Sequence, residues 1–131
     1  MTLPEIATAC ESAGPERQRE LLVEAYATIH NQEPANDQWY GDTETKTRGR
    51  YFTAKLDAEA YLDAAMMLVP EGHSVDLTIG GYWPNRARLM PVYQEGSRWL
   101  HRGSDLHYTA NASTSALALL AAICRALGSE G

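Results

Sequence analysis

Hydrophobic residues recur at helical spacing twice before residue 31. Thr2 and Glu5 match a capping box at the start of a first helix, which we expect to end near Ser12. Gly14–Pro15 then starts a second helix, because proline is tolerated in the first helical turn. This second helix is expected to run to about His30, with a buried face made of Leu21, Leu22, Ala25, Tyr26 and Ile29.

No hydrophobic period survives between Asn31 and Arg50, and this stretch therefore predicts a 20-residue loop. A loop of that length is uncommon in a compact domain unless it is disordered or functional, and both alternatives stay open. A third helix is expected after it, with Asp57 as its N-cap and Pro70 and Gly72 as its stop. Its predicted buried face comprises Ala58, Tyr61, Leu62, Ala65, Leu68 and Val69.

The hydrophobic period changes from helical to two residues after Gly72. In "SVDLTIG", residues 74–80, apolar and polar positions alternate as in a strand with one buried face. The segments "ARLMPVY" (87–93) and "RWLHR" (98–102) predict two more strands, and "LHYTA" (106–110) is the candidate for a fourth. Pro91 should confine its strand to an edge of the sheet or to a bulge.

The C-terminal segment predicts a helix that is apolar on nearly every side. Ser113 is its expected N-cap and Gly128 its expected stop, and "ALALLAAIC" between them suits a helix buried against a sheet and other helices. The order of elements is therefore three helices, an antiparallel meander of three or four short strands and a closing helix. The sequence predicts one α+β domain spanning residues 1–131, with helices packed on a small antiparallel sheet.

Three segments resemble, in order and spacing, the phage ABA sandwich family of small phage proteins. They are "GPERQRELLVEA", "YFTAKLDAEAYLDAAMMLVPEG" and "ASTSALALLAAICRAL", and about one helical turn is inserted around Tyr61 relative to the family pattern. The resemblance implies a phage origin and an α-β-α sandwich, and it carries no catalytic residue over. It also suggests an activity, because many small phage proteins look like host-defence inhibitors, some of which sequester nucleotide immune signals.

The net charge of the chain, −6, argues against general nucleic-acid binding, because neutralising phosphates requires a basic surface. The charge is unevenly distributed, since residues 80–108 hold four of the 11 basic residues and only two of the 17 acidic ones. Cys10 and Cys124 lie in apolar helical settings and are expected to be reduced. The longest apolar run, Ala116–Cys124, is too short to cross a membrane, and we expect a cytoplasmic protein.

The stretch "GGYWPNRAR", residues 80–88, is the strongest candidate for a binding site. Tyr82 and Trp83 offer aromatic faces for stacking on a base, and Arg86 and Arg88 offer planar forks for phosphate oxygens. The next predicted strand repeats the mixture with Arg98, Trp99, His101 and Arg102. If the two strands are neighbours, the first two arginines face one way and can share a surface with this second cluster. A plain hairpin corner, in which the glycines supply positive φ, is the alternative explanation.

A further basic and aromatic cluster lies in the predicted loop. Trp39 and Tyr40 can fold over a ligand or dock on a partner chain, and Arg48 and Arg50 follow in the segment "KTRGRYF". An ordinary solvated loop is the alternative explanation for these two arginines, because arginines in loops are common.

Motifs for catalysis and metal binding are weak in this chain. Asp105 and His107 sit two residues apart and, with His101 nearby, could form a partial metal site or an acid–base pair. No further ligands accompany them, and the chain has neither a nucleophile elbow nor a glycine-rich phosphate loop. We therefore expect no catalytic residue, no metal and no cofactor.

Together these patterns predict a non-enzymatic phage protein that sequesters a small anionic, nucleotide-type immune signal in the infected bacterial cell, without a membrane partner. Two alternatives stay open. One is a nuclease or phosphodiesterase that uses His101, Asp105 and His107, and the other is an inhibitor that docks on a host enzyme. We also expect a homo-oligomer, because the chain holds more surface aromatics than a monomer of this size comfortably exposes: Trp39, Tyr40, Trp83 and Trp99.

Overall fold

The computed structural model describes residues 1–31, 43–79, 85–96, 98–101 and 107–130. Within them, five α-helices pack on a four-stranded antiparallel sheet, which confirms the predicted α+β class. The elements in chain order are α1 Leu3–Ser12, the 3-10 turn η1 Pro15–Arg17, α2 Gln18–His30, α3 Thr43–Asp57, α4 Tyr61–Met66, β1 His73–Thr78, β2 Asn85–Glu95, β3 Arg98–His101, β4 Tyr108–Ala112 and α5 Ser115–Glu130.

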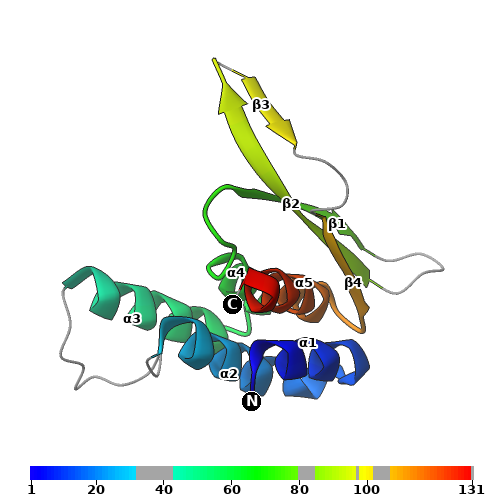
Figure 1. Cartoon of the computed structure of the whole chain (residues 1–131). Coiled ribbons are helices and arrows are strands. Elements are labelled where there is room, and N and C mark those ends of the chain that lie inside the picture. Colours follow the sequence, from blue (N-terminus) through cyan, green and yellow to red (C-terminus); the bar gives the residue numbers. More distant parts are fainter. Residues whose placement is uncertain (32–42, 80–84, 97, 102–106, 131) are drawn as a thin grey trace.

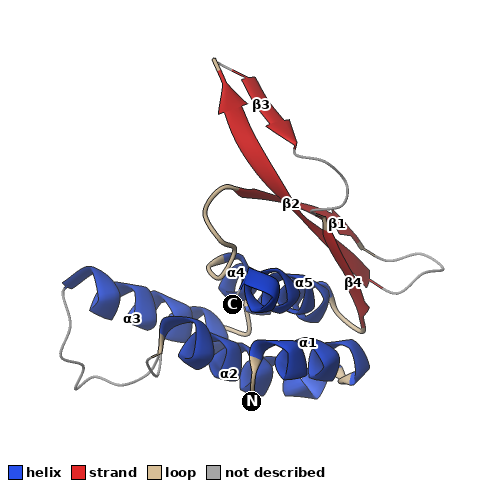
Figure 2. Ribbon diagram, in the orientation of Figure 1, coloured by secondary structure: helices blue, strands red, loops and turns tan. Residues whose placement is uncertain are grey.

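The helices of the described residues cover one face of the sheet. α5 lies directly against β2 and β4, and its other sides contact α1, α4 and α2 (Figure 1). The layers are therefore the sheet, then α5, then the outer helices, so that α5 and not the sheet is in the middle (Figure 2). Among the described elements, no helix covers the opposite face of the sheet.

Strand β2 organises the sheet because every other strand pairs with it. β1 and β4 flank its first half in antiparallel register, with Arg88 opposite Asp76 on β1 and Thr109 on β4. Its second half continues past them and pairs with β3 from Val92↔His101 to Glu95↔Arg98. The second half of β2 and β3 thus form a two-stranded ribbon that projects beyond the helices (Figure 1).

Pro91 lies in this central strand, although it was expected to mark an edge or a bulge. The Val92 N–H donates to the Gly72 carbonyl at 2.8 Å, on the β1 side of β2. Because successive N–H groups point to opposite edges of a strand, the position of Pro91 faces the other edge. On that edge the pairing stops at Leu89↔Tyr108 and resumes at Val92↔His101. The proline therefore falls where no ladder hydrogen bond is required of it.

The capping residue predicted for α1 is confirmed, and the one predicted for α5 is wrong. The predicted capping box of α1 is present, with the Thr2 hydroxyl accepting from the Glu5 N–H and the Glu5 carboxylate accepting from the Thr2 N–H. For α5 the prediction of Ser113 as N-cap is wrong, because the hydroxyl that accepts from the Leu117 N–H belongs to Thr114, at 3.1 Å. The Ser113 hydroxyl instead donates to the Ala13 carbonyl at 2.8 Å and ties α5 to the end of α1.

Gly128 does not end α5, contrary to the prediction, because the helix continues to Glu130. A Cβ at this position would lie 3.2 Å from the Pro4 ring, which is closer than ordinary van der Waals contact. The glycine therefore serves the close approach of α5 to the start of α1 and not the termination of the helix.

The predicted loop between Asn31 and Arg50 is wrong in its second half, where Thr43–Arg50 forms the first part of α3. Residues 32–42 lie outside the described residues. The helix was missed because its buried stripe is narrow: of residues 47–57, whose burial is described, Gly49, Phe52 and Leu56 are the buried ones, and the charged residues around them hide the period.

α3 ends in a motif around Glu59 that the sequence did not predict. Asp57 was predicted to cap a third helix, but it is the last residue of α3, and a separate short helix, α4, follows at Tyr61. Glu59 has a φ of +58°. Its N–H bonds to the Leu56 carbonyl at 3.0 Å, and the Ala60 N–H bonds to the Lys55 carbonyl at 2.8 Å. This pair of hydrogen bonds is a Schellman motif, with Glu59 at the position that glycine usually takes.

Glu59→Gly should therefore stabilise the protein by about 0.5–1 kcal/mol, because it removes the left-handed strain of a residue with a Cβ, less the entropy that glycine loses on folding. Urea unfolding followed by circular dichroism measures this change. Glu20→Gly, in the first turn of α2, serves as the comparison and should destabilise by about 1 kcal/mol. A lower midpoint for Glu59→Gly would contradict the strain at Glu59.

The core is built around α5, as its apolar sequence predicted. Leu117, Leu119, Leu120 and Ile123 are fully buried, together with Cys10 on α1 and Cys124 on α5. Both cysteines are free thiols, and burial raises the pKa of each to about 12. At the edge of this core Arg125 forms an ion pair with Glu11 of α1. Among the described residues, no helix is both long and apolar enough to cross a bilayer.

Candidate ligand-binding face

The face of the sheet opposite the helices, which we call the outer face, carries the exposed polar residues of three strands. Along β2, Ala87 and Leu89 are buried against α5, while Arg86 and Arg88 are exposed on the opposite side. The two-residue period of a strand forces this separation. The exposed residues of the flanking strands are Asp76 and Thr78 on β1 and Thr109 and Asn111 on β4.

The register groups these six side chains into two rows across the sheet. The first row is Thr78, Arg86 and Asn111, and we call it the Arg86 row. The second is Asp76, Arg88 and Thr109, and we call it the Arg88 row. Side chains directly opposite one another on neighbouring antiparallel strands lie within reach of each other. Each arginine is therefore flanked by two polar side chains.

Arg86 is held in place by its neighbour on β4. Its Nε donates to the Oδ1 of Asn111 at 3.1 Å. This bond uses the Nε of the guanidinium and does not involve the two terminal nitrogens. Those two nitrogens form the fork that binds phosphate or carboxylate oxygens. A fork whose orientation is fixed in advance loses less entropy when an anion binds.

The connection between β1 and β2 is attached at the Arg86 row. The segment that holds Tyr82 and Trp83 leaves β1 after Thr78 and enters β2 at Asn85, although residues 80–84 themselves lie outside the described residues. Asn85 Nδ2 donates to the Ser113 carbonyl at 2.9 Å and anchors this end of β2. Ile79, at the start of the connection, is 66% exposed.

The described members of the second predicted cluster lie farther along the sheet than the two arginines, opposite residues 92–95 of β2. Arg98, Trp99 and His101 lie on β3, and Arg98 pairs with Glu95. Glu95 is seven residues along β2 from Arg88, which corresponds to about 24 Å in an extended strand. A small ligand on the Arg86 row therefore does not reach the turn of the ribbon. Arg102 lies outside the described residues.

The third predicted cluster is on the helical side of the molecule. Arg48 and Arg50 belong to α3, which lies across α5 from the outer face (Figure 1). Arg48 Nη1 is 3.3 Å from His30 Nδ1, and burial together with Arg48 lowers the pKa of this histidine, which is therefore neutral and can accept. The position of Arg48 thus has a structural explanation. Arg50 is exposed, and Trp39 and Tyr40 lie outside the described residues.

The sequence did not point to four members of the outer face. Asp76 and Thr78 were visible as the polar positions of the predicted first strand, and that alternation was the available signal. Thr109 and Asn111 could not be assigned, because their place beside the arginines depends on the antiparallel register of β4 against β2.

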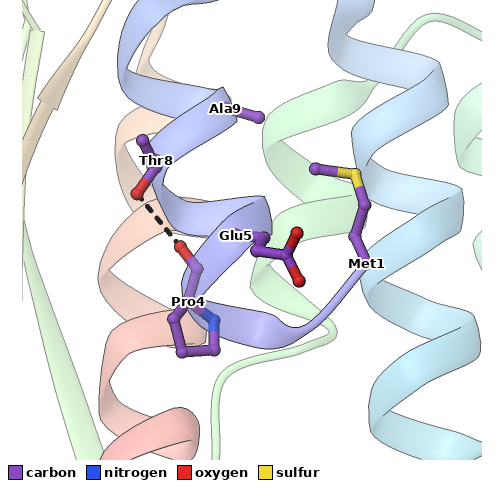
Figure 3. Close-up of a pocket in the computed structure, with 5 residues that line it drawn as sticks. All are labelled: Met1, Pro4, Glu5, Thr8 and Ala9. Atoms are coloured by element: carbon purple, nitrogen blue, oxygen red, sulfur yellow. Dashed lines mark hydrogen bonds between the residues drawn. The ribbon is translucent and has the colours of Figure 1, made fainter.

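A hollow of about 480 Å³ on the helical side is a different kind of surface (Figure 3). Its polar groups are already used: the Thr8 hydroxyl donates to the Pro4 carbonyl at 3.1 Å, and the Glu5 carboxylate caps α1. Hydrogen bonding to Thr2 lowers the pKa of Glu5. The remaining lining comes from Met1 and Ala9, and the N-terminal ammonium of Met1 already pairs with Glu24.

Comparisons with family models, curated proteins and solved structures give no match for this chain. Within the described part of the chain, no three His, Cys, Asp or Glu side chains are grouped so that they could hold a metal ion. By its fold and its candidate site, this is an α+β protein in which helices cover one face of the sheet and the other face carries exposed arginines.

Proposed function

We propose that the protein binds a small anionic, nucleotide-type ligand on the outer face and holds it without cleaving it. The observation that carries this proposal is the pair of exposed arginines on one strand face, one of them oriented by Asn111. The resemblance to small phage proteins supplies the context. The ligand is then a nucleotide immune signal of the bacterial host, which the protein sequesters in the cytoplasm of the infected cell.

Binding is favoured over catalysis by the side chains that accompany the arginines. The Arg86 row and the Arg88 row provide two guanidinium groups, two threonine hydroxyls, one amide and one carboxylate. Such groups recognise phosphates and hydroxyls, and the one candidate general base among them, Asp76, lies opposite Arg88 in the strand register. Tyr82 and Trp83, which the sequence predicts as stacking partners of a base, lie outside the described residues.

A release experiment tests this function. The protein is incubated with a panel of cyclic and linear nucleotides, filtered to measure depletion of each nucleotide, denatured, and analysed by chromatography. Depletion followed by release of the intact nucleotide is the expected result. Release of cleavage products would support a phosphodiesterase or nuclease instead, and absence of depletion would support a protein–protein inhibitor.

We also propose that a second copy of the chain packs on the β2–β3 ribbon, residues 92–101. Among the described elements β3 packs substantially on β2 alone, and an isolated two-stranded hairpin is only marginally stable in water. Its turn is tight, with Gly96 at a φ of +62° between the paired residues Glu95 and Arg98. These two charges cancel, so that in a chain of net charge −6 the ribbon is a region where two copies can approach with little repulsion.

Light scattering at micromolar concentration should therefore give a mass of at least twice the 14.4 kDa of the monomer. Trp99→Pro should reduce it to the monomer mass. Successive N–H groups point to opposite edges of a strand, and the Val92 N–H points toward β1 and away from β3. The register then directs the Trp99 N–H away from β2. Proline at position 99 removes this N–H and blocks pairing with another chain, while the hairpin is kept. A parent protein that scatters as a monomer would contradict self-association.

A further inference from the structure

The two rows of the outer face differ in charge, and this difference has a consequence for the ligand. In the Arg86 row the neighbours of the arginine are neutral, namely Thr78 and Asn111. In the Arg88 row the neighbour on β1 is Asp76, an exposed carboxylate. The face thus has one end with a cation alone and a second end with a cation and an anion side by side.

The distance between the two ends is fixed by the strand. Arg86 and Arg88 are two residues apart, which places their Cα atoms about 7 Å from each other. A phosphate held by the Arg86 fork therefore has the Asp76 carboxylate within the span of one sugar. A carboxylate accepts hydrogen bonds and repels anions, so the ligand must present hydroxyl or amine donors there and not a second phosphate.

We propose that Asp76 is a selectivity residue, which accepts the ribose hydroxyls of a ribonucleotide and excludes compact polyanions such as pyrophosphate. This inference rests on the proposed function, because it requires a phosphate at Arg86. Vicinal ribose hydroxyls are a common partner of a carboxylate in nucleotide-binding sites, where the carboxylate replaces their hydrogen bonds to water. Arg88, opposite Asp76 in the strand register, then balances the charge of this carboxylate.

A simpler role for Asp76 is to neutralise Arg88. The two roles predict opposite changes in the affinity for a ribonucleotide when the charge of Asp76 is removed. If Asp76 only lowers the positive potential of the face, its removal strengthens the binding of every anion. If it accepts ribose hydroxyls, its removal weakens the binding of a ribonucleotide while it strengthens the binding of pyrophosphate. Asp76→Asn separates the two, because the amide keeps the shape of the side chain and loses the charge.

Calorimetric titration of the full chain with adenosine monophosphate, its 2′,3′-dideoxy analogue and pyrophosphate provides the test. The parent should bind the ribonucleotide about 10-fold more tightly than the dideoxy analogue, as expected for one charge-assisted hydrogen bond. In Asp76→Asn this preference should disappear, and the affinity for pyrophosphate should rise several-fold. Asp63→Asn, an equal change of charge at an exposed position of α4, should alter none of the three affinities.

Two outcomes overturn the inference in distinguishable ways. If Asp76→Asn binds the ribonucleotide more tightly than the parent, or if the parent does not distinguish the dideoxy analogue, Asp76 is not a selectivity residue, although the face still binds nucleotides. If the parent binds none of the three probes, the proposed function fails with it. A thermal melt of each variant shows whether the fold is intact.

Discussion

Arg86→Ala should weaken nucleotide binding by about 10- to 150-fold, because a charge-assisted contact to phosphate contributes about 1.5–3 kcal/mol. The same substitution should change the free energy of unfolding by less than about 0.5 kcal/mol, since the side chain is exposed and its hydrogen bond to Asn111 joins two exposed side chains. Calorimetric titration with cyclic and linear nucleotides, alongside thermal melts, measures both quantities. Arg88→Ala should also weaken binding, because it leaves the negative charge of Asp76 unbalanced beside the bound anion.

The matched control for this prediction is Arg19→Ala. Arg19 is an exposed arginine of α2 that pairs with Asp57 at 2.8 Å, far from the outer face. Its removal lowers the net charge by the same amount and should leave nucleotide affinity unchanged. Equal weakening by both variants would indicate a long-range charge effect and not a site. If Arg86→Ala and Arg88→Ala both bind like the parent, "GGYWPNRAR" is a hairpin corner without a binding role.

Leu120→Ala should lower the free energy of unfolding by about 2–5 kcal/mol, the largest loss of stability that we expect from a single substitution in α5. Leu120 is 0% exposed, at the centre of a helix that contacts the sheet on one side and α1 and α4 on others. Truncation at such a position removes buried apolar surface and leaves a cavity that packed neighbours on several sides cannot close. Urea unfolding and the melting temperature report the change.

Met66→Ala is the comparison for Leu120→Ala. Met66 ends the neighbouring helix α4 but is 45% exposed, so its truncation should cost less than about 1 kcal/mol. Equal midpoints for the parent and Leu120→Ala would show that α5 is not the central layer of the fold.

The elements that the sequence predicted are those whose signals are local. Thr2 and Glu5 announce α1 by residue type and spacing, and β1 is visible in the alternation around Val75 and Leu77. α3 could not be found in this way, because its polar surface outweighs its narrow buried stripe. The end of α3 at Glu59 and the close approach of Gly128 to Pro4 depend on backbone geometry and on contacts between distant segments, which residue types alone do not report.

The candidate site, like the fold, was predictable only where the signal in the sequence is local. The common face of Arg86 and Arg88 follows from the period of a strand. The partners of these arginines do not follow from it, since Asn111 is 25 positions from Arg86 and meets it only through the register of β4. The same register shows that Arg98 belongs to the ribbon and not to this face, a separation that the sequence could not reveal.

A map of where a nucleotide binds tests the site on the outer face most directly. In ¹⁵N-labelled protein titrated with adenosine monophosphate, the backbone amide signals that shift should be those of residues 76–78 on β1, 86–88 on β2 and 109–111 on β4. Signals of α1 and α2, around the hollow near Met1, should not move. Shifts confined to these helices, or no shifts at saturating nucleotide, would contradict a binding site on the outer face of the sheet.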